Sequence, residues 1–163
     1  MRIAYEGGVK EFLNSMSIVL AEDSLSENVR RLAELAIVGY PQEYYPKGIF
    51  YFVKTEFQYA QDPVDAELLQ RPNLVATDYF NGIRRAMDCD CQATLISAML
   101  RSIGIEARIA IIDSNMDGEW SHAIAQVKSD IFNEYVNLDT TTPTLPLGWF
   151  QPYTKITYVV AHQ

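Results

Sequence analysis

Apolar residues recur at helical spacing in the segment that follows Ser24. Ser24 and Glu27 have the spacing of a capping box, so the pattern predicts a helix that begins after Ser24. Gly39 and Pro41 interrupt the pattern and indicate where this helix ends. The face expected to point inward consists of Leu25, Val29, Leu32 and Ala36.

A second amphipathic helix is predicted over about Pro46 to Phe57, and a less regular segment follows it. This segment, Tyr59 to Met87, contains Asp62-Pro63 and Arg71-Pro72, which interrupt regular structure. Between these two breaks, a short helical turn is expected over Glu67 to Gln70.

The pattern becomes helical again at about Asp88 and stops at Gly104. Glycine is typical of the position just after a helix C-terminus, so the helix is expected to end there. The inward stripe of this helix is expected to be Leu95, Ile96, Met99, Leu100 and Ile103.

After Gly104 the chain becomes rich in β-branched residues and in alternating patterns. Four strands are predicted: Ile105 to Asp113, Trp120 to Lys128, Glu134 to Asp139 and Lys155 to Ala161. Helices followed by strands predict an α+β fold in which an antiparallel sheet packs on the helices. We expect one domain over residues 1–163, with its core at about 46–161 and an N-terminal helical region at 1–45.

Composition and charge narrow the classes of function. The formal net charge is -8, and no segment clusters Lys and Arg, which argues against nucleic acid and anionic lipid as partners. No apolar run approaches the roughly 20 residues of a membrane span. The N-terminal residues lack the apolar core of a signal peptide. A cytoplasmic protein without a membrane partner is therefore expected.

The two cysteines, Cys89 and Cys91, are candidates for chemistry rather than for a disulfide. One residue separates them, and a bridge across so short a loop would be strained. Cys89 falls at a predicted helix start, where unpaired N–H groups and the helix dipole favour a thiolate. The charges of Asp88 and Asp90 oppose this effect, although Asp88 can also cap the helix. Cys91 is about 200° around the helix from Cys89 and is expected to be buried in the core.

A nucleophilic cysteine needs a base, and the base needs an acceptor that orients it. Of the two histidines, His162 is next to the end of the chain, whereas His122 lies in a predicted strand. Asp139 ends the next strand, and adjacent antiparallel strands can place His122 and Asp139 side by side. Taken alone, such a histidine is more often structural and such an aspartate is more often a turn residue.

Three motifs in this region resemble the transglutaminase-like superfamily. They are Cys89-x3-Ala93-x-Leu95-x2-Ala98-x2-Arg101-x2-Gly104-Ile105-x-Ala107-Arg108, then His122-Ala123, then Leu138-Asp139-x-Thr141. Their order and spacing match the family over roughly residues 50–148, and the register assigns the nucleophile to Cys89. The resemblance implies a papain-like core, with the nucleophile helix packed on an antiparallel sheet, and a Cys89, His122, Asp139 triad.

A narrower resemblance links the chain to small transglutaminase-like proteins of tailed phages and prophages. It is carried by Tyr59-x2-Asp62-Pro63-Val64-x2-Glu67-Leu68-Leu69-Gln70-x-Pro72, by Asp88-Cys89-Asp90 and by Leu147-Gly148-Trp149. Association with a virion is therefore open. The chain departs from the family at Cys91, which replaces an acidic residue, at Ile124, which replaces an aromatic residue, and at Thr140, which replaces proline.

The resemblance implies attack of Cys89 on an amide of a peptide or protein, with no metal and no cofactor. His122 would exchange the proton, Asp139 would orient His122, and the Cys89 backbone N–H would bind the oxyanion. Tyr59 is a second candidate oxyanion donor, although a packed aromatic residue explains it equally well. Transfer of the thioester to water gives a peptidase or amidase, which we favour, and transfer to lysine gives a cross-linking transglutaminase.

Two rival hypotheses remain. A metal site could use the run Asp88 to Cys91 together with His122, but zinc sites usually draw on two separated ligand pairs. Alternatively, the fold could serve as a structural or interaction module in which the triad is idle, because fold alone does not prove activity.

Overall fold

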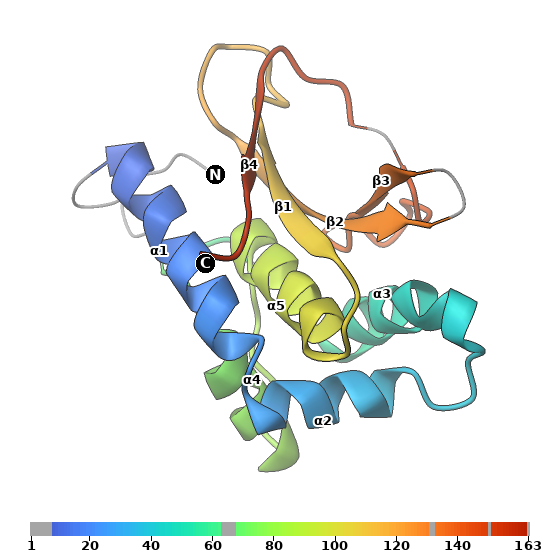
Figure 1. Cartoon of the computed structure of the whole chain (residues 1–163). Helices are drawn as coiled ribbons and strands as arrows, with labels where there is room; N and C mark the ends of the chain where they lie inside the picture. Colours follow the sequence, from blue (N-terminus) through green and yellow to red (C-terminus); the bar gives the residue numbers. More distant parts are fainter. Residues whose placement is uncertain (1–7, 63–67, 131–132, 150, 163) are drawn as a thin grey trace.

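Helices precede a four-stranded antiparallel sheet, which confirms the predicted α+β order (Figure 1). The structure is a computed structural model and describes residues 8–62, 68–130, 133–149 and 151–162. Its helices are α1 (Gly8–Asp23), α2 (Glu27–Ala36), the 3-10 helix η1 (Gln42–Tyr44), α3 (Tyr45–Glu56), α4 (Pro72–Phe80) and α5 (Cys89–Ser102). Its strands are β1 (Ala107–Ile112), β2 (His122–Ser129), β3 (Glu134–Leu138) and β4 (Ile156–Val159).

Helix α5 is the centre of the core. Every residue from Cys89 to Leu100 is buried, as expected of a helix that is covered on all sides. Figure 1 shows the sheet along one side of α5 and the other helices around it, and α5 contacts β1, β2 and each of α1 to α4. The predicted stripe is buried from Leu95 to Leu100, and Ile103 packs at its margin.

Both ends of α5 are fixed by local chemistry. At the start, the side chain of Asp88 accepts a hydrogen bond from the Cys91 backbone N–H at 3.3 Å. At the end, Gly104 has a φ of 84°, and Ile105 N–H donates to Leu100 O at 3.0 Å. A positive φ is readily accessible to glycine, so this residue lets the chain reverse into β1.

The sheet has the strand order β3-β2-β1-β4, and each neighbouring pair is antiparallel. Ala125 of β2 pairs with Leu138 of β3. The beginning of β2 therefore lies beside the end of β3. This pairing brings His122, the first residue of β2, close to Asp139, the residue after β3.

The prediction that Ser24 and Glu27 form a capping box at the start of the first predicted helix is wrong. Ser26, not Ser24, caps α2, and its hydroxyl oxygen accepts from Val29 N–H at 3.5 Å. Ser24 instead donates to Leu20 O at the end of α1. Leu25, expected to point inward, is 88% exposed, because it lies in the connection between α1 and α2. The remaining residues of the expected face are buried.

Helix α4 lies in the segment that the sequence pattern left irregular. It begins at Pro72, which is favourable in the first turn of a helix although it interrupts a helix interior. Of the helical turn expected over Glu67 to Gln70, residue 67 lies outside the described residues, and residues 68–70 have no regular secondary structure. None of the helices in the described ranges has the length and apolar character needed to span a membrane.

If burial of α5 stabilises the fold, then Leu100→Ala should lower the free energy of unfolding by about 2–5 kcal/mol, because Leu100 is fully buried. Leu25→Ala removes the same atoms from an exposed site and should change the free energy of unfolding by less than about 0.5 kcal/mol. Urea unfolding followed by circular dichroism measures both. Equal losses in the two variants would contradict this assignment of the core.

Candidate active site

Cys89 is the first residue of α5, as predicted. Its backbone N–H belongs to the first turn, where N–H groups have no partner within the helix. The backbone N–H of Ala123, the residue after His122, donates a hydrogen bond to the Cys89 sulfur. The nucleophile candidate therefore lies against the start of β2, which also carries the candidate base.

Burial and nearby charge oppose ionisation of the Cys89 thiol, against the expectation that the helix start favours a thiolate. Burial raises the pKa of the Cys89 thiol well above its ordinary value, and the charges of Asp90 and Asp88 raise it further. The hydrogen bond from Ala123 lowers this pKa but does not compensate. Cys89 is also only 3% exposed, so its sulfur does not open directly onto a cleft in this structure.

Cys91 is a buried structural thiol, as the helical register predicts. It is fully buried, and its sulfur donates to Leu68 O and accepts from Gln70 N–H, both at 3.2 Å. These two bonds attach the segment before α4 to the nucleophile helix. Burial raises the pKa of Cys91 above its ordinary value, which keeps this sulfur in the thiol form.

His122 and Asp139 form the contact that the sequence predicts. His122 Nε2 lies 2.7 Å from Asp139 Oδ2, and both side chains are largely buried. Because Nε2 is engaged by Asp139, Nδ1 is the ring nitrogen left to exchange a proton with a thiol. The predicted contact between Cys89 Sγ and the His122 ring stays a prediction.

Asp139 uses both carboxylate oxygens. Oδ1 accepts from the Thr141 backbone N–H at 3.1 Å and from the Thr141 hydroxyl at 2.7 Å, while Oδ2 contacts His122. Burial alone would raise the pKa of Asp139, but the hydrogen bonds and charge of His122, together with the Thr141 bonds, lower it below 3.8. Asp139 is thus an ionised acceptor that can orient an imidazole and stabilise an imidazolium.

A buried hydrogen bond that the sequence analysis missed links the nucleophile helix to the Asp139 segment. The Thr140 hydroxyl donates to Gln92 Oε1 at 2.6 Å. Gln92 lies in the first turn of α5, and Thr140 follows Asp139 directly. Thr140 was noted only as a departure from the family's proline. A buried glutamine close to the nucleophile was the signal for a partner of this kind, because buried amides are rarely left unsatisfied.

Tyr59 lies beside the residues that lead into α5. It forms a parallel bridge with Met87, in which Ala60 N–H donates to Met87 O and Met87 N–H donates to Gln58 O, each at 3.0 Å. Burial raises the pKa of Tyr59 to about 12, and the charges of Cys89, when it is ionised, and of Asp88 act in the same direction. Its hydroxyl therefore keeps its proton and can donate. Its oxyanion role stays a prediction.

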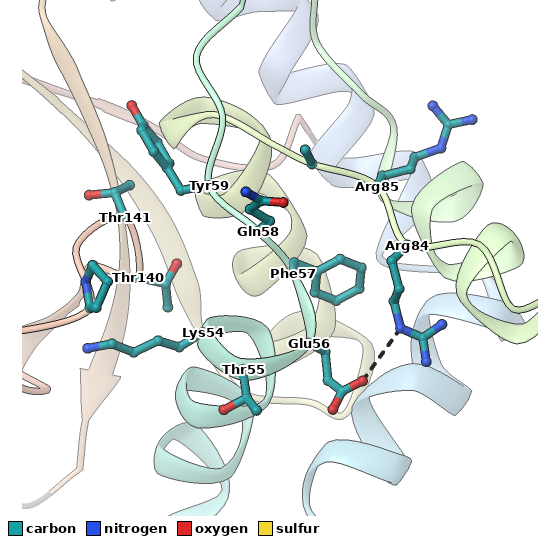
Figure 2. A pocket seen from close by; sticks show the side chains of 12 residues that line it. Lys54, Thr55, Glu56, Phe57, Gln58, Tyr59, Arg84, Arg85, Thr140 and Thr141 are labelled. Carbon is teal, nitrogen blue, oxygen red and sulfur yellow. Dashed lines mark ion pairs between the residues drawn. The ribbon is translucent and has the colours of Figure 1, made fainter.

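A pocket of about 430 Å³ lies beside these residues (Figure 2). Tyr59, Thr140 and Thr141 line it on the side of the candidate triad. The pocket also includes Lys54, Thr55, Glu56, Phe57, Gln58, Arg84, Arg85, Ala86 and Pro143. Cys89, which is buried, is not among the residues that line the pocket.

The hypothesis of a metal site at Asp88 to Cys91 and His122 is weakened, because two of these expected ligands are hydrogen-bonded to other groups. Among the described residues, the group that could hold an ion is Asp88, Cys89 and Asp90, whose ligand atoms lie within 4.8 Å of one another. Cys91 is bonded to backbone groups and His122 to Asp139, and neither joins that group. Two carboxylates and one thiol from consecutive residues are a poor donor set for zinc.

The chain belongs to the transglutaminase-like superfamily, whose family model matches residues 38–140. This range contains Cys89, His122 and Asp139. Among curated proteins, none matches the chain. A solved structure from Cytophaga hutchinsonii, described as a candidate cysteine protease, is similar with 17% identity and a TM-score of 0.49. The alignment covers 69% of this chain and 37% of that one.

The lowered pKa of Asp139 makes the stability contributed by this carboxylate depend on pH. Because the pKa is lower in the folded state than in the unfolded chain, the contribution is present at neutral pH and is lost as pH falls below about 4. Asp139→Asn should therefore lower the free energy of unfolding by about 1–3 kcal/mol at pH 7 and by less at pH 3. Urea unfolding at several pH values measures this difference, with the exposed Glu119→Gln as control. If the loss of unfolding free energy in Asp139→Asn stays constant down to pH 3, the lowered pKa of Asp139 is contradicted.

Asp88→Asn should lower the pKa of the Cys89 thiol, because it removes one nearby negative charge. Asparagine still accepts the capping bond from Cys91 N–H, so the helix start should persist. The measurement is the pH dependence of Cys89 alkylation by iodoacetamide, located by peptide mass mapping. The midpoint should move to lower pH in Asp88→Asn and stay in place in the exposed Asp130→Asn. An unchanged midpoint in Asp88→Asn would refute the electrostatic explanation.

Proposed function

We propose that this protein is a cysteine-nucleophile enzyme that cleaves amide bonds through Cys89, His122 and Asp139. Family membership supports cysteine chemistry in general. The observation that carries the proposal is the 2.7 Å contact between His122 and a buried, ionised Asp139, beside the strand residue that binds the Cys89 sulfur. An isolated structural histidine would not need a carboxylate held on both oxygens.

The reaction begins with proton transfer from the Cys89 thiol to His122 Nδ1. The sulfur then attacks the amide carbonyl carbon, and the carbonyl oxygen takes up the negative charge. As the C–N bond breaks, the imidazolium gives its proton to the leaving amine, and a thioester remains on Cys89. Asp139 stabilises the imidazolium throughout.

The oxyanion would be bound by two donors. One is the Cys89 backbone N–H in the first turn of α5. The second is the Tyr59 hydroxyl, whose pKa of about 12 keeps it a donor at neutral pH. Tyr59 also lines the pocket, so the substrate carbonyl would approach the sulfur from the pocket, past Tyr59.

The turn over Asn115 to Gly118, beside Trp120, is held by its own hydrogen bonds and by Lys155. Asp113 accepts from the N–H groups of Asp117 at 3.2 Å and Gly118 at 2.8 Å, which holds the turn closed. Lys155 bonds to Gly118 O and lies over the Trp120 ring at 4.2 Å.

We favour hydrolysis over cross-linking for the second half of the reaction. A lysine acceptor entering through the pocket would pass the like charges of Lys54, Arg84 and Arg85, whereas water carries no charge. Cross-linking and an idle module are the alternatives. The narrower motif resemblance also leads us to propose an origin among phage or prophage proteins, acting in the cytoplasm or associated with a virion.

Peptide libraries with and without an amine donor test this proposal. The wild-type protein should release amine from some peptides, and Cys89→Ala should reduce the rate at least about a thousandfold. Cys91→Ala, which removes the other buried thiol, should lower stability by about 1–3 kcal/mol but retain activity in the folded fraction. Conjugates with the amine donor would indicate cross-linking. Full activity of Cys89→Ala, or no activity in any arm, would refute the proposed chemistry.

A further inference from the structure

The pocket beside the candidate triad carries positive charge in an acidic protein. The whole chain has a formal charge of -8. Among the described lining residues, however, Lys54, Arg84 and Arg85 are cationic and Glu56 is the one carboxylate. An anionic ligand would be repelled by most of the surface and attracted here, because a concave site concentrates the field of its own charges.

The cations are spread around the pocket rather than gathered at the sulfur. In Figure 2, Lys54 lies on the same side as Thr140, Thr141 and Tyr59, whereas Arg84 lies on the opposite side. The carboxylates nearest the nucleophile, Asp88 and Asp90, are buried outside the pocket lining. A bound substrate would therefore place neutral amide atoms at the sulfur and an acidic group farther out in the pocket.

The two arginines are held in place by their neighbours. Arg84 lies with its guanidinium carbon 3.7 Å from the Tyr79 ring centroid, and its Nε is 3.5 Å from Glu56 Oε2. Arg85 Nε contacts Asp78 Oδ2 at 2.5 Å. A guanidinium has five N–H donors in a planar fork, so one ion pair leaves donor capacity for a ligand.

Lys54 is positioned by a backbone carbonyl and by an aromatic ring. Its ammonium donates to Leu145 O at 2.6 Å and lies 5.0 Å from the Phe50 ring centroid. An ammonium has three donors, so Lys54 can bind a second acceptor without giving up Leu145. The side chain is half-buried, which reduces the entropy lost when it orders around a ligand.

We propose that this pocket selects peptide substrates that carry a carboxylate near the amide bond to be cleaved. The inference rests on the proposed function, since it concerns the substrate of the same site. Lys54 on one side of the pocket and Arg84 on the other are the two candidate partners of the carboxylate, and Tyr59 and Thr141 line the pocket on the side of Lys54. A glutamate or aspartate side chain, or a free α-carboxylate, supplies the required chemistry.

The test compares peptides that differ by one Glu-to-Gln replacement, scanned through the positions on each side of the cleaved bond. At one position, Glu should raise kcat/KM over Gln by about fivefold, as expected for a partly exposed charge pair. Arg84→Gln and Lys54→Gln should each reduce this preference. Arg30→Gln is the matched control, because Arg30 forms a similar exposed pair with Glu34 outside the pocket. The preference should weaken at high salt.

A binding arm separates failure of this inference from failure of the proposed function. Fluorescence anisotropy with labelled Glu and Gln peptides measures binding to the wild-type protein and to Cys89→Ala, without requiring turnover. Tighter binding of the Glu peptide that is lost in Arg84→Gln or Lys54→Gln supports the anion site even if no peptide is cleaved. Turnover with equal rates for Glu and Gln peptides overturns the inference and leaves the proposed function standing. Equal binding of both peptides, with no turnover, overturns both.

Discussion

Packing of α5 against the sheet is the constraint on which the rest of the structure depends. The helix is buried on all sides, so its axis and rotation are fixed by the sheet on one side and by the other helices around it. The first residue of α5 must then lie at the end of the sheet where strand β2 begins and strand β3 ends. Cys89, His122 and Asp139 occupy these three positions, and the Gln92–Thr140 hydrogen bond links the helix to the Asp139 segment. The same packing that stabilises the domain thus determines the geometry of the candidate site.

Burial makes the candidate nucleophile, the Cys89 thiol, harder to ionise. The start of a helix favours a thiolate, but here burial and the two flanking carboxylates raise the pKa of the Cys89 thiol. The protein compensates by keeping Asp139 ionised with three donors, so the adjacent imidazole can accept and hold a proton. In the proposed reaction, His122 takes up the proton that the buried thiol must lose.

The sequence was sufficient for features that depend on local pattern. Helix α5, its glycine terminus and the four strands follow from spacing and from β-branched composition, and the register distinguishes Cys89 from Cys91. Helix α4 was missed because its proline lies at a helix start, where the same residue that breaks a helix also begins one. Leu25 was misplaced because a neighbouring helix ends just before it. The burial of Cys89, the Gln92–Thr140 bond and the cationic pocket depend on residues far apart in the chain, which spacing alone cannot bring together.

The claim that Cys89 is the nucleophile is tested most directly by trapping its covalent intermediate. The wild-type protein would be mixed with an activated peptide ester, quenched in acid within the first turnover and digested for mass mapping. An ester acylates faster than an amide, so the thioester should accumulate before it is hydrolysed. The account predicts an acyl group on the peptide that contains Cys89, attached to that residue. An acyl group on Cys91, or release of the alcohol with no adduct on Cys89, would contradict it.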